Sequence, residues 1–425
     1  MEEQFLSYLW RYKLLSADLR TTAGETVEII RPGEINPDSG PDFLHARIKI
    51  GSTTWAGHVE LHVRASDWYA HGHHDDPAYA HLILHLVYED DLRDGPEAIQ
   101  GLPVAEVKGF YAPELYARYR AFMENRQWLA CAPQIRDVEA IIRSAWLERL
   151  AFERFERKAE ILQHEMSTES LSWERAFLRS LAGSFGGRVN KEAFQQLFTS
   201  IPQTALAFAR RDLVSLEALL LGQAGLAGES AEDDYMIRLR AVYRGLKRKY
   251  RLKPLAPGTI RFLRMRPLSF PGLRAAQLAW LLHRYDHLFH RCIEAGGTEA
   301  LTAMFRARAS DYWNTHYRPG KVAPAHSVIL GEDAVTIILV NTVAPFLFLY
   351  YRQKDDKQGC ESAVNLLTRI PPEENSIVQR WRKLGMAVSD ALGSQALLEL
   401  KSRYCQNRRC TDCAIGHRIF SSSLQ

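Results

Sequence analysis

The spacing of hydrophobic residues changes along the chain, from a period of two in the first third to a helical period afterwards. An amphipathic helix is expected from Glu3 to Leu15, and alternating runs predict four strands, at residues 27–30, 46–50, 55–63 and 82–88. From Val138 the pattern is helical almost throughout. The predicted fold class is therefore α+β, with a small mixed α/β sheet domain over residues 1–130 and a large all-α region over residues 131–425.

The second and third predicted strands form a hairpin that carries two acidic residues. Gly51-Ser52 supplies the turn, Asp42 stands just before the second strand, and Glu60 lies in the third. Side chains two apart share a strand face, so Glu60, His62 and Arg64 are expected to point the same way. Two carboxylates held close together repel each other and gain most from a shared divalent cation. The hairpin therefore predicts a Mg²⁺ or Mn²⁺ site suited to phosphoryl chemistry.

Pro41-Asp42 and Glu60-Leu61-His62 resemble the motif of the PD-(D/E)xK nuclease superfamily, with His62 where that motif has lysine. Neutral histidine accepts a proton and its charged form stabilises an anion, so the substitution is compatible with chemistry. Two other readings stay open. The site has lost its activity, or the segment is an ordinary hairpin with Asp42 in a turn and Glu60 on a solvated face.

The resemblance implies a role for each residue of the site. Asp42 and Glu60 would hold the metal, and His62 would orient or deprotonate the attacking water. Arg64 or a neighbouring histidine would balance the charge on the phosphate. Glu3, on the first helix, would approach the metal as a helix acid does in related nucleases.

Motifs along nearly the whole chain also resemble an uncharacterised bacterial family that brings no established activity with it. The motifs are Asn36, Gly40-Pro41-Asp42-Phe43, Val59-Glu60-Leu61-His62, Ser66-Asp67-Trp68 with His71 and His73, Arg266-Pro267, Phe270-Pro271, Arg274, Asn341 to Phe346, Ser394 to Leu397, and the C-terminal cysteines.

Charge is distributed unevenly. Residues 1–130 hold 12 of the 54 Lys and Arg but 20 of the 50 Asp and Glu, so an acidic front precedes a basic remainder. Eleven basic and no acidic residues lie between Arg238 and Arg266. These like charges repel one another, and contacts with phosphate groups would offset that repulsion. The interleaved aromatic residues Tyr243, Tyr250 and Phe262 are expected to stack on unpaired bases. The predicted partner is nucleic acid, principally DNA, with RNA or the acidic front domain as alternatives; the residues are Arg244, Lys247, Arg248, Lys249, Arg251, Arg264 and Arg266.

Cysteines gather at the C-terminal end, as Cys405, Cys410 and Cys413 followed by His417. This spacing predicts a structural metal, either zinc completed by His417 or an iron–sulfur cluster completed by a distant thiolate. Cys131 is the first choice for that thiolate and Cys360 the second. Nearby arginines are expected to lower the thiol pKa values. Unliganded thiols are the alternative.

Eight of the 15 histidines lie between His45 and His85, beside the acidic hairpin. His71, His73 and His74 are candidates for a transition metal or for phosphate contacts, and His85 is expected to face the same cleft as Glu60. Hydrogen-bonded structural roles are the alternative for these histidines.

Several functional classes lose support. The sequence contains no Gly-x4-Gly-Lys-Ser/Thr loop, no Gly-x-Gly-x-x-Gly and no Gly-x-Ser-x-Gly. The apolar run from Ala334 to Tyr351 is interrupted by Asn341 and Pro345, which favours a buried helix over a membrane span. Six cysteines without an export signal indicate the cytoplasm.

The leading hypothesis is a cytoplasmic metal-dependent nuclease acting on DNA. The alternatives are a non-catalytic nucleic-acid-binding or scaffold protein with a degenerate nuclease fold, and a metal-dependent hydrolase of a small substrate. The oligomeric state does not follow from the sequence.

Overall fold

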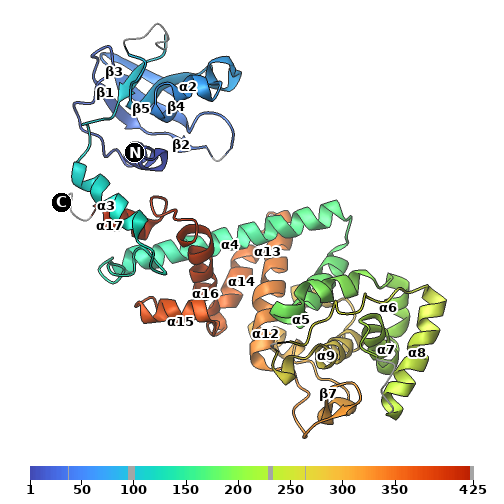
Figure 1. The fold of residues 1–425 in the computed structure, drawn as a ribbon. Coiled ribbons are helices and arrows are strands. Elements are labelled where there is room, and N and C mark those ends of the chain that lie inside the picture. The colour runs from blue at the N-terminus through green and yellow to red at the C-terminus, as the bar shows by residue number, and fades with distance from the viewer. Residues whose placement is uncertain (37, 94–100, 228–232, 264, 422–425) are drawn as a thin grey trace. The chain divides into compact units, whose positions relative to one another are not determined.

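The computed structural model describes residues 1–36, 38–93, 101–227, 233–263 and 265–421. The chain forms two compact units (Figure 1). The sheet unit combines residues 1–146 with residues 400–425, and the helical unit comprises residues 147–399. The predicted boundary at residue 130 therefore differs from this division, and the C-terminal segment joins the front of the chain rather than the helical region. Periodicity along the sequence does not reveal such a return, because it depends on contacts between distant residues.

The sheet unit is built on a mixed sheet of six strands with the order β1-β3-β4-β5-β6 and with β2 paired to β3. β3 pairs antiparallel with β1 and β4, whereas β5 pairs parallel with β4 and β6. The four predicted strands are present, and β2 and β6 are additional. The bounds are β1 Val27–Arg31, β2 Glu34–Ile35, β3 Phe43–Ile50, β4 Thr53–Arg64, β5 Leu82–Glu89 and β6 Val104–Glu106.

The parallel pairing of β4 with β5 requires a crossover, which here is short. It consists of helix α2 (Asp67–Ala70) and two 3₁₀ turns, His73–Asp75 and Pro77–Tyr79. This connection carries many of the front-half histidines and places them beside β4.

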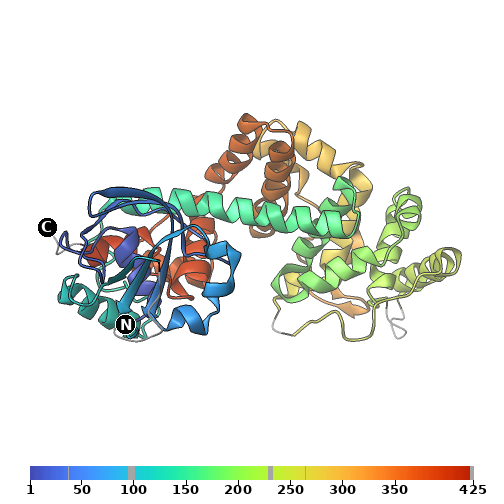
Figure 2. The ribbon, with the colours of Figure 1, turned by 90° about the horizontal axis from the view of Figure 1, so that it is seen from above.

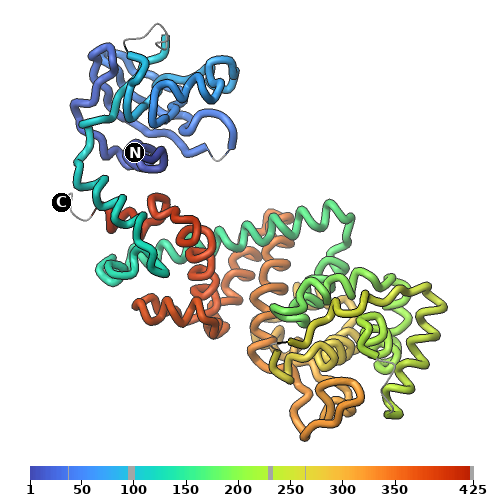
Figure 3. Tube along the Cα trace, viewed as in Figure 1, coloured from blue at the N-terminus to red at the C-terminus, as the bar shows by residue number. Residues whose placement is uncertain are grey.

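Helix α1 (Glu3–Arg11) packs against β4, and Phe5, Leu6, Leu9 and Trp10 are fully buried in the core below the sheet (Figure 1). It ends four residues before the predicted Leu15. Two helices that the sequence pattern did not predict complete the unit: α3 (Pro113–Glu124) and α17 (Ala414–Ser421). The Cα trace shows these two segments side by side, although they are far apart in sequence (Figure 3).

In the described part of the helical unit, the secondary structure is helical apart from one two-stranded ribbon, as predicted, and Figure 2 shows these helices from above. Helix α4 begins in the sheet unit and continues into the helical unit. The bounds are α4 Ala140–Thr168, α5 Trp173–Thr199, α6 Gln203–Ala209, α7 Leu213–Gln223, α8 Asp234–Tyr250, α9 Pro271–Arg284, α10 Leu288–Glu294, α11 Thr298–Met304, β7 His316–Arg318, β8 Lys321–Val322, α12 Glu332–Ile338, α13 Ala344–Gln353, α14 Lys357–Asn365, α15 Ser376–Lys383 and α16 Ala391–Glu399.

Two features of these helices bear on function. Helix α5 is kinked at Gly187, whose φ of 60° and ψ of −165° suit glycine. Between α12 and α13 the residues Leu339–Val343 form a π-helical turn, a distortion that often marks a functional site. Among the described residues, Glu332–Gln353 is the one helical stretch long and apolar enough to cross a bilayer, and 67% of its most apolar window is buried inside the protein. That burial matches the predicted core helix.

Candidate functional site

The two hairpin carboxylates lie side by side where β3 enters the sheet. Asp42 Oδ2 accepts a hydrogen bond from the Leu61 N–H (3.0 Å), and Glu60 Oε2 accepts one from the Asp42 N–H (3.0 Å). The register between β3 and β4 shifts between Phe43 and Ala46, and His45 there has a φ of 56°. Bulges of this kind redirect side chains beside active sites. The backbone therefore holds two acidic groups against each other, as predicted from the hairpin.

A third carboxylate lies within electrostatic reach of Asp42 and Glu60. Glu3 stands in the first turn of α1, and its partial burial together with the negative charge of Asp42 raises its pKa. Burial also raises the pKa of Asp42, against the hydrogen bond from Leu61. Burial and the charge of Asp42 raise the pKa of Glu60 to about 8, with Glu3 adding to the effect and the Asp42 N–H opposing it. The fold thus collects three mutually repelling carboxyl groups, which is the electrostatic condition that favours a cation.

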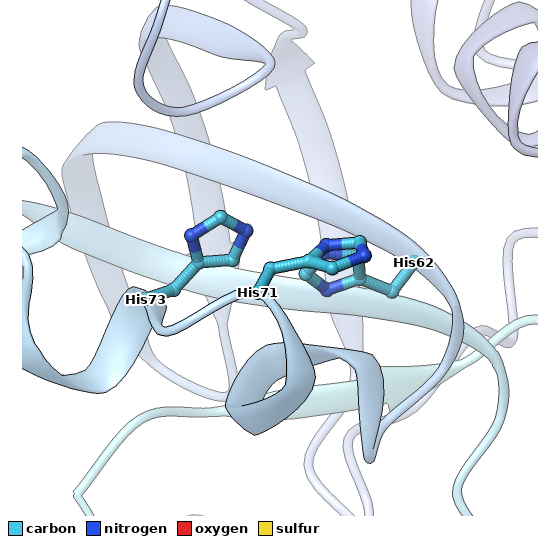
Figure 4. A group of neighbouring side chains, drawn as sticks. All are labelled: His62, His71 and His73. Atoms are coloured by element: carbon cyan, nitrogen blue, oxygen red, sulfur yellow. The ribbon is translucent and has the colours of Figure 1, made fainter.

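Imidazoles form the other half of the site. His62 Nδ1 lies 2.8 Å from His85 Nε2, and His62 Nε2 lies 3.2 Å from His71 Nδ1. Glu60 Oε1 faces both His73 Nε2 (3.3 Å) and His62 Nε2 (3.6 Å). Figure 4 shows His62 on β4, with His71 and His73 on the crossover connection beside it. Nitrogen atoms of these three residues lie within 4.8 Å of one another, a spacing that could hold a metal ion.

Burial keeps the inner histidines neutral. Glu60 is 4% exposed, His62 2% and His85 0%. Burial and the neighbouring His73 and His71 lower the pKa of His62 to about 4, and burial with His62 lowers that of His85 to about 3. When His62 Nδ1–H donates to His85 Nε2, the lone pair of His62 Nε2 faces His71 and Glu60. A hydrogen bond of this kind selects the tautomer that can accept a proton or bind a metal.

Aromatic rings complete the wall around the histidines. Tyr79 stacks on His73 with ring centroids 4.1 Å apart, and Trp68 lies edge-on to both His73 and Tyr79. Both rings are largely buried, whereas Glu3 and His71 are exposed, so the group meets solvent at their side. The sequence analysis named Ser66-Asp67-Trp68 only as a motif of the resembled family and did not single out Tyr79. A lone tyrosine in a connection carries no periodic signal.

Arg64 does not lie with the other predicted catalytic residues. It is exposed at the end of β4, and its charge acts on Asp91. The Arg64 N–H donates to Asp67 Oδ2, because the chain turns into α2 at that point. The face shared by Glu60 and His62 thus ends before Arg64, and histidines stand where the arginine was expected.

One family matches most of the chain. The family described as "Protein of unknown function (DUF2851)" matches residues 3–376. The chain belongs to this family. The match includes all the residues of the acidic and imidazole groups, and it ends before the C-terminal cysteines of this DUF2851 member. No curated protein and no solved structure matches the chain.

The cysteines of this DUF2851 chain form a second candidate site inside the sheet unit. Cys131 lies within electrostatic reach of Cys410 and Cys413, and Cys405 lies within reach of the other three. Cys131, the first choice for the distant thiol, therefore lies in the same region of the sheet unit as the C-terminal trio. The Cys413 sulfur also accepts hydrogen bonds from the backbone N–H groups of Ile415 and Gly416, at the start of α17. Among the described residues, no three cysteine sulfurs lie within 4.8 Å of one another.

The other proposed ligands lie elsewhere. His417 stacks on Tyr12 at 3.8 Å, and its Nδ1 lies 3.1 Å from the Tyr8 hydroxyl. Cys360 belongs to the helical unit, where its thiol is 3.8 Å from the Phe348 carbonyl oxygen. The expected lowering of thiol pKa values is wrong. Burial, the largest effect on each of the four clustered thiols, raises them, to about 12 for Cys131.

The basic segment occupies α8 and the irregular chain after it. Its described candidates are all exposed: Arg244, Lys247, Arg248, Lys249, Arg251 and Arg266. Arg264 lies outside the described residues. The aromatic half of the prediction is wrong for Tyr243, which is buried and donates a hydrogen bond to Gln223 (2.9 Å). Helical periodicity turns Tyr243 to the core, while the lysines and arginines around it face solvent.

Proposed function

We propose that this protein is a metal-dependent nuclease that hydrolyses phosphodiester bonds of DNA. The observation that carries the proposal is the gathering of Glu3, Asp42 and Glu60 beside a neutral, buried His62. Carboxylate oxygens are the ligands that Mg²⁺ and Mn²⁺ prefer, so this donor set fits such an ion. Asp42 and Glu60 would hold the ion, which would polarise the phosphate, and Glu3 would add charge at the open side.

His62 takes the part of the proton acceptor. Its low pKa keeps it neutral at physiological pH, and the contact with His85 directs its Nε2 lone pair toward the acidic group. Water attacks phosphorus as its proton passes to His62, and the bond to the leaving oxygen breaks. His71 and His73 would supply hydrogen-bonding partners for the phosphate, a role that the resemblance gave to Arg64 or a neighbouring histidine. The exposed lysines and arginines of α8 would contact the DNA backbone, giving affinity without sequence preference.

Cleavage by the purified full chain tests this proposal. With Mg²⁺ or Mn²⁺ the protein should nick or degrade DNA. Glu60→Gln and His62→Ala should each lower the rate by about a hundredfold or more, while DNA binding persists. Glu34→Gln and His81→Ala are matched controls, because both residues are exposed and of the same types. If the protein binds DNA but does not cleave it with either metal, the result would contradict the nuclease and favour a non-catalytic scaffold.

A second candidate function rests on the imidazole trio. His62, His71 and His73 offer three nitrogen donors at metal-binding distance, which suits Zn²⁺ or Mn²⁺ better than Mg²⁺. With Glu60 beside them, the group fits a metal-dependent hydrolase of a small substrate. Tight Zn²⁺ binding by calorimetry, abolished in His71→Ala with His73→Ala, together with inactivity on DNA, would favour this function over the nuclease.

We also propose that Cys131, Cys405, Cys410 and Cys413 hold a structural metal centre. Four thiolates could hold either a zinc ion or an iron–sulfur cluster, and the N–H groups at the start of α17 suit the negative charge of the cluster. Brown colour and bound iron that disappear in Cys131→Ser but persist in Cys360→Ser would support it. Stoichiometric zinc without iron would select the zinc alternative, and neither metal would contradict both. All six cysteines are free thiols, which suits a cytoplasmic location.

A further inference from the structure

A cavity of about 520 Å³ opens in the helical unit, and all of its lining residues belong to that unit. It is bounded by α4, α5 and the α12–α13 stretch, and six cationic side chains but only two carboxylates, Glu165 and Glu373, line it. The cations are Arg154, Arg157, Lys158, Arg179, Arg188 and Lys191. Protein surfaces normally mix both charges, so a concave wall with this excess of positive charge suits an anionic ligand.

Half of these cations are already neutralised. Arg154 and Arg157 both bind the buried carboxylate of Glu399, at 2.8 and 2.6 Å, and Arg179 binds Glu165 at 2.9 Å. These ion pairs fix the walls of the cavity and leave little charge for a ligand.

The other three cations make no ion pair with any described carboxylate. Lys158 Nζ contacts only neutral oxygens, Asn341 Oδ1 at 3.1 Å, Gln395 Oε1 at 2.9 Å and the Val340 carbonyl at 3.5 Å. Arg188 and Lys191 are exposed at the kink of α5. Burial lowers the pKa of Lys158 well below its ordinary value, and the charges of Arg154, Arg157 and Lys191 lower it further. An anion bound beside Lys158, Arg188 and Lys191 would relieve the repulsion among these groups and stabilise the charged form of Lys158.

The backbone around the cavity is also shaped for a ligand. The π-helical turn projects Asn341 to the rim and buries Thr342, whose hydroxyl contacts Ser184 Oγ at 2.8 Å and Ser180 Oγ at 3.3 Å. Apolar side chains, among them Ile161 and Phe346, form part of the wall. The cavity therefore pairs a cationic end with an apolar side, the combination required by a phosphate carried on an organic group.

We infer that this cavity binds a phosphate group through Lys158, Arg188 and Lys191, either on a free phosphate ester of nucleotide size or on a nucleic-acid strand. Asn341 and Gln395 hold the Lys158 ammonium in place. The inference is independent of the nuclease proposal, because it uses no residue of the sheet unit.

Binding to the full chain tests the inference with three probes: inorganic phosphate, adenosine monophosphate and a short single-stranded oligonucleotide. Thermal stabilisation and calorimetry at constant ionic strength should show that the wild type binds adenosine monophosphate. Arg188→Ala with Lys191→Ala should weaken that binding at least about tenfold. Both side chains are exposed, so this variant should keep its fold, whereas Lys158→Gln serves as a second variant at the cavity floor.

Lys354→Ala with Lys357→Ala is the matched control, since both are exposed lysines of the same unit outside the cavity. Competition identifies the source of the phosphate. If the oligonucleotide displaces adenosine monophosphate, the cavity binds a nucleic-acid strand. If it does not, the cavity binds a free phosphate ester. Wild-type affinity in the Arg188 and Lys191 variant, or no binding of any probe, would overturn the inference.

Discussion

Glu60 is the residue at which the acidic and imidazole groups meet. One of its oxygens accepts the Asp42 N–H, and the other faces His62 and His73. A proton, an imidazolium or a metal ion can each neutralise this buried carboxylate. Which of them does so depends on pH and on the supply of metal, so the chemistry of the site depends on Glu60 more than on any neighbour.

The raised pKa of Glu60 predicts how stability depends on pH. Its folded pKa of about 8 exceeds the ordinary 4.5, so the folded chain holds the proton more tightly than the unfolded chain does. This contribution is fully present below pH 4.5 and is lost as pH rises through 8. The unfolding temperature of metal-free protein should therefore contain a component that falls across this range. Thermal melts of Glu60→Gln should lack that component, whereas those of Glu34→Gln should retain it.

Metal binding should depend on the proton of Glu60, because the ion must displace it. As pH rises toward 8, Mn²⁺ affinity should therefore increase by up to about tenfold per pH unit, and above pH 8 it should level off. Calorimetry in buffers of different ionisation enthalpy would count the released proton. An affinity that does not change with pH between about 6 and about 8 would contradict this account.

His85 is a positioning residue in this site. It is buried, touches His62 Nδ1 and has no hydrogen-bond partner at its own Nδ1. His85→Phe should keep a ring of similar size but remove the contact that selects the His62 tautomer. Activity should fall by about 10- to 100-fold. The loss should fall on kcat and change the pH profile, with KM little altered. His81→Ala, at an exposed position just before β5, should leave both unchanged.

At the scale of elements, the parallel pairing of β4 with β5 brings the site together. Glu60 pairs with His85 and His62 with Val87, so one register sets both the acidic and the imidazole contacts. A slip by one residue would turn these side chains to the opposite face of the sheet. The positions of the site's side chains therefore depend on this single pairing register.

The register of β4 against β5 depends on the lack of a side chain at Gly57. A Cβ atom there would lie 2.5 Å from the His81 carbonyl oxygen and 2.4 Å from Ile83 Cγ2, both on the chain that forms β5. Gly57→Ala should lower the free energy of unfolding by about 1–3 kcal/mol and weaken activity as the strands separate. Gly245→Ala is the matched control in α8, where the added Cβ meets open space and should stabilise the helix by about 0.5–1 kcal/mol. Chemical denaturation measures both.

At the scale of the whole molecule, the sheet unit is assembled from both ends of the chain. Gln4 donates to Thr411 Oγ1 at 3.0 Å, Arg418 pairs with Glu139 at 2.6 Å, and Phe420 is 1% exposed in the core. The C-terminal segment is therefore a structural part of the unit that carries the candidate active site, although it lies beyond the residues matched by the family.

Weakening or removing the C-terminal segment should lower the stability of the sheet unit more than that of the helical unit. Phe420 packs against Tyr8, Tyr119 and Phe122, so Phe420→Ala should lower the stability of that unit by about 3–5 kcal/mol. A chain ending at Glu399 should lose the sheet unit's cooperative unfolding transition and retain that of the helical unit. Hydrogen exchange would assign the loss to residues, and equal loss in both units would contradict the division.

Sequence alone determined those features that depend on near neighbours. Alternation fixed the strands around Asp42 and Glu60, and helical periodicity identified most of the all-α region. The same local rules placed Glu60 and His62 on one face, and chemistry then suggested a cation site.

Only the tertiary structure decided which distant residues meet. It brought Glu3 near Asp42, brought Cys131 near the C-terminal thiols and built the cationic cavity around Lys158. None of these follows from spacing, because burial and close approach arise when separate elements pack, and packing depends on the shapes of surfaces that a linear pattern does not contain.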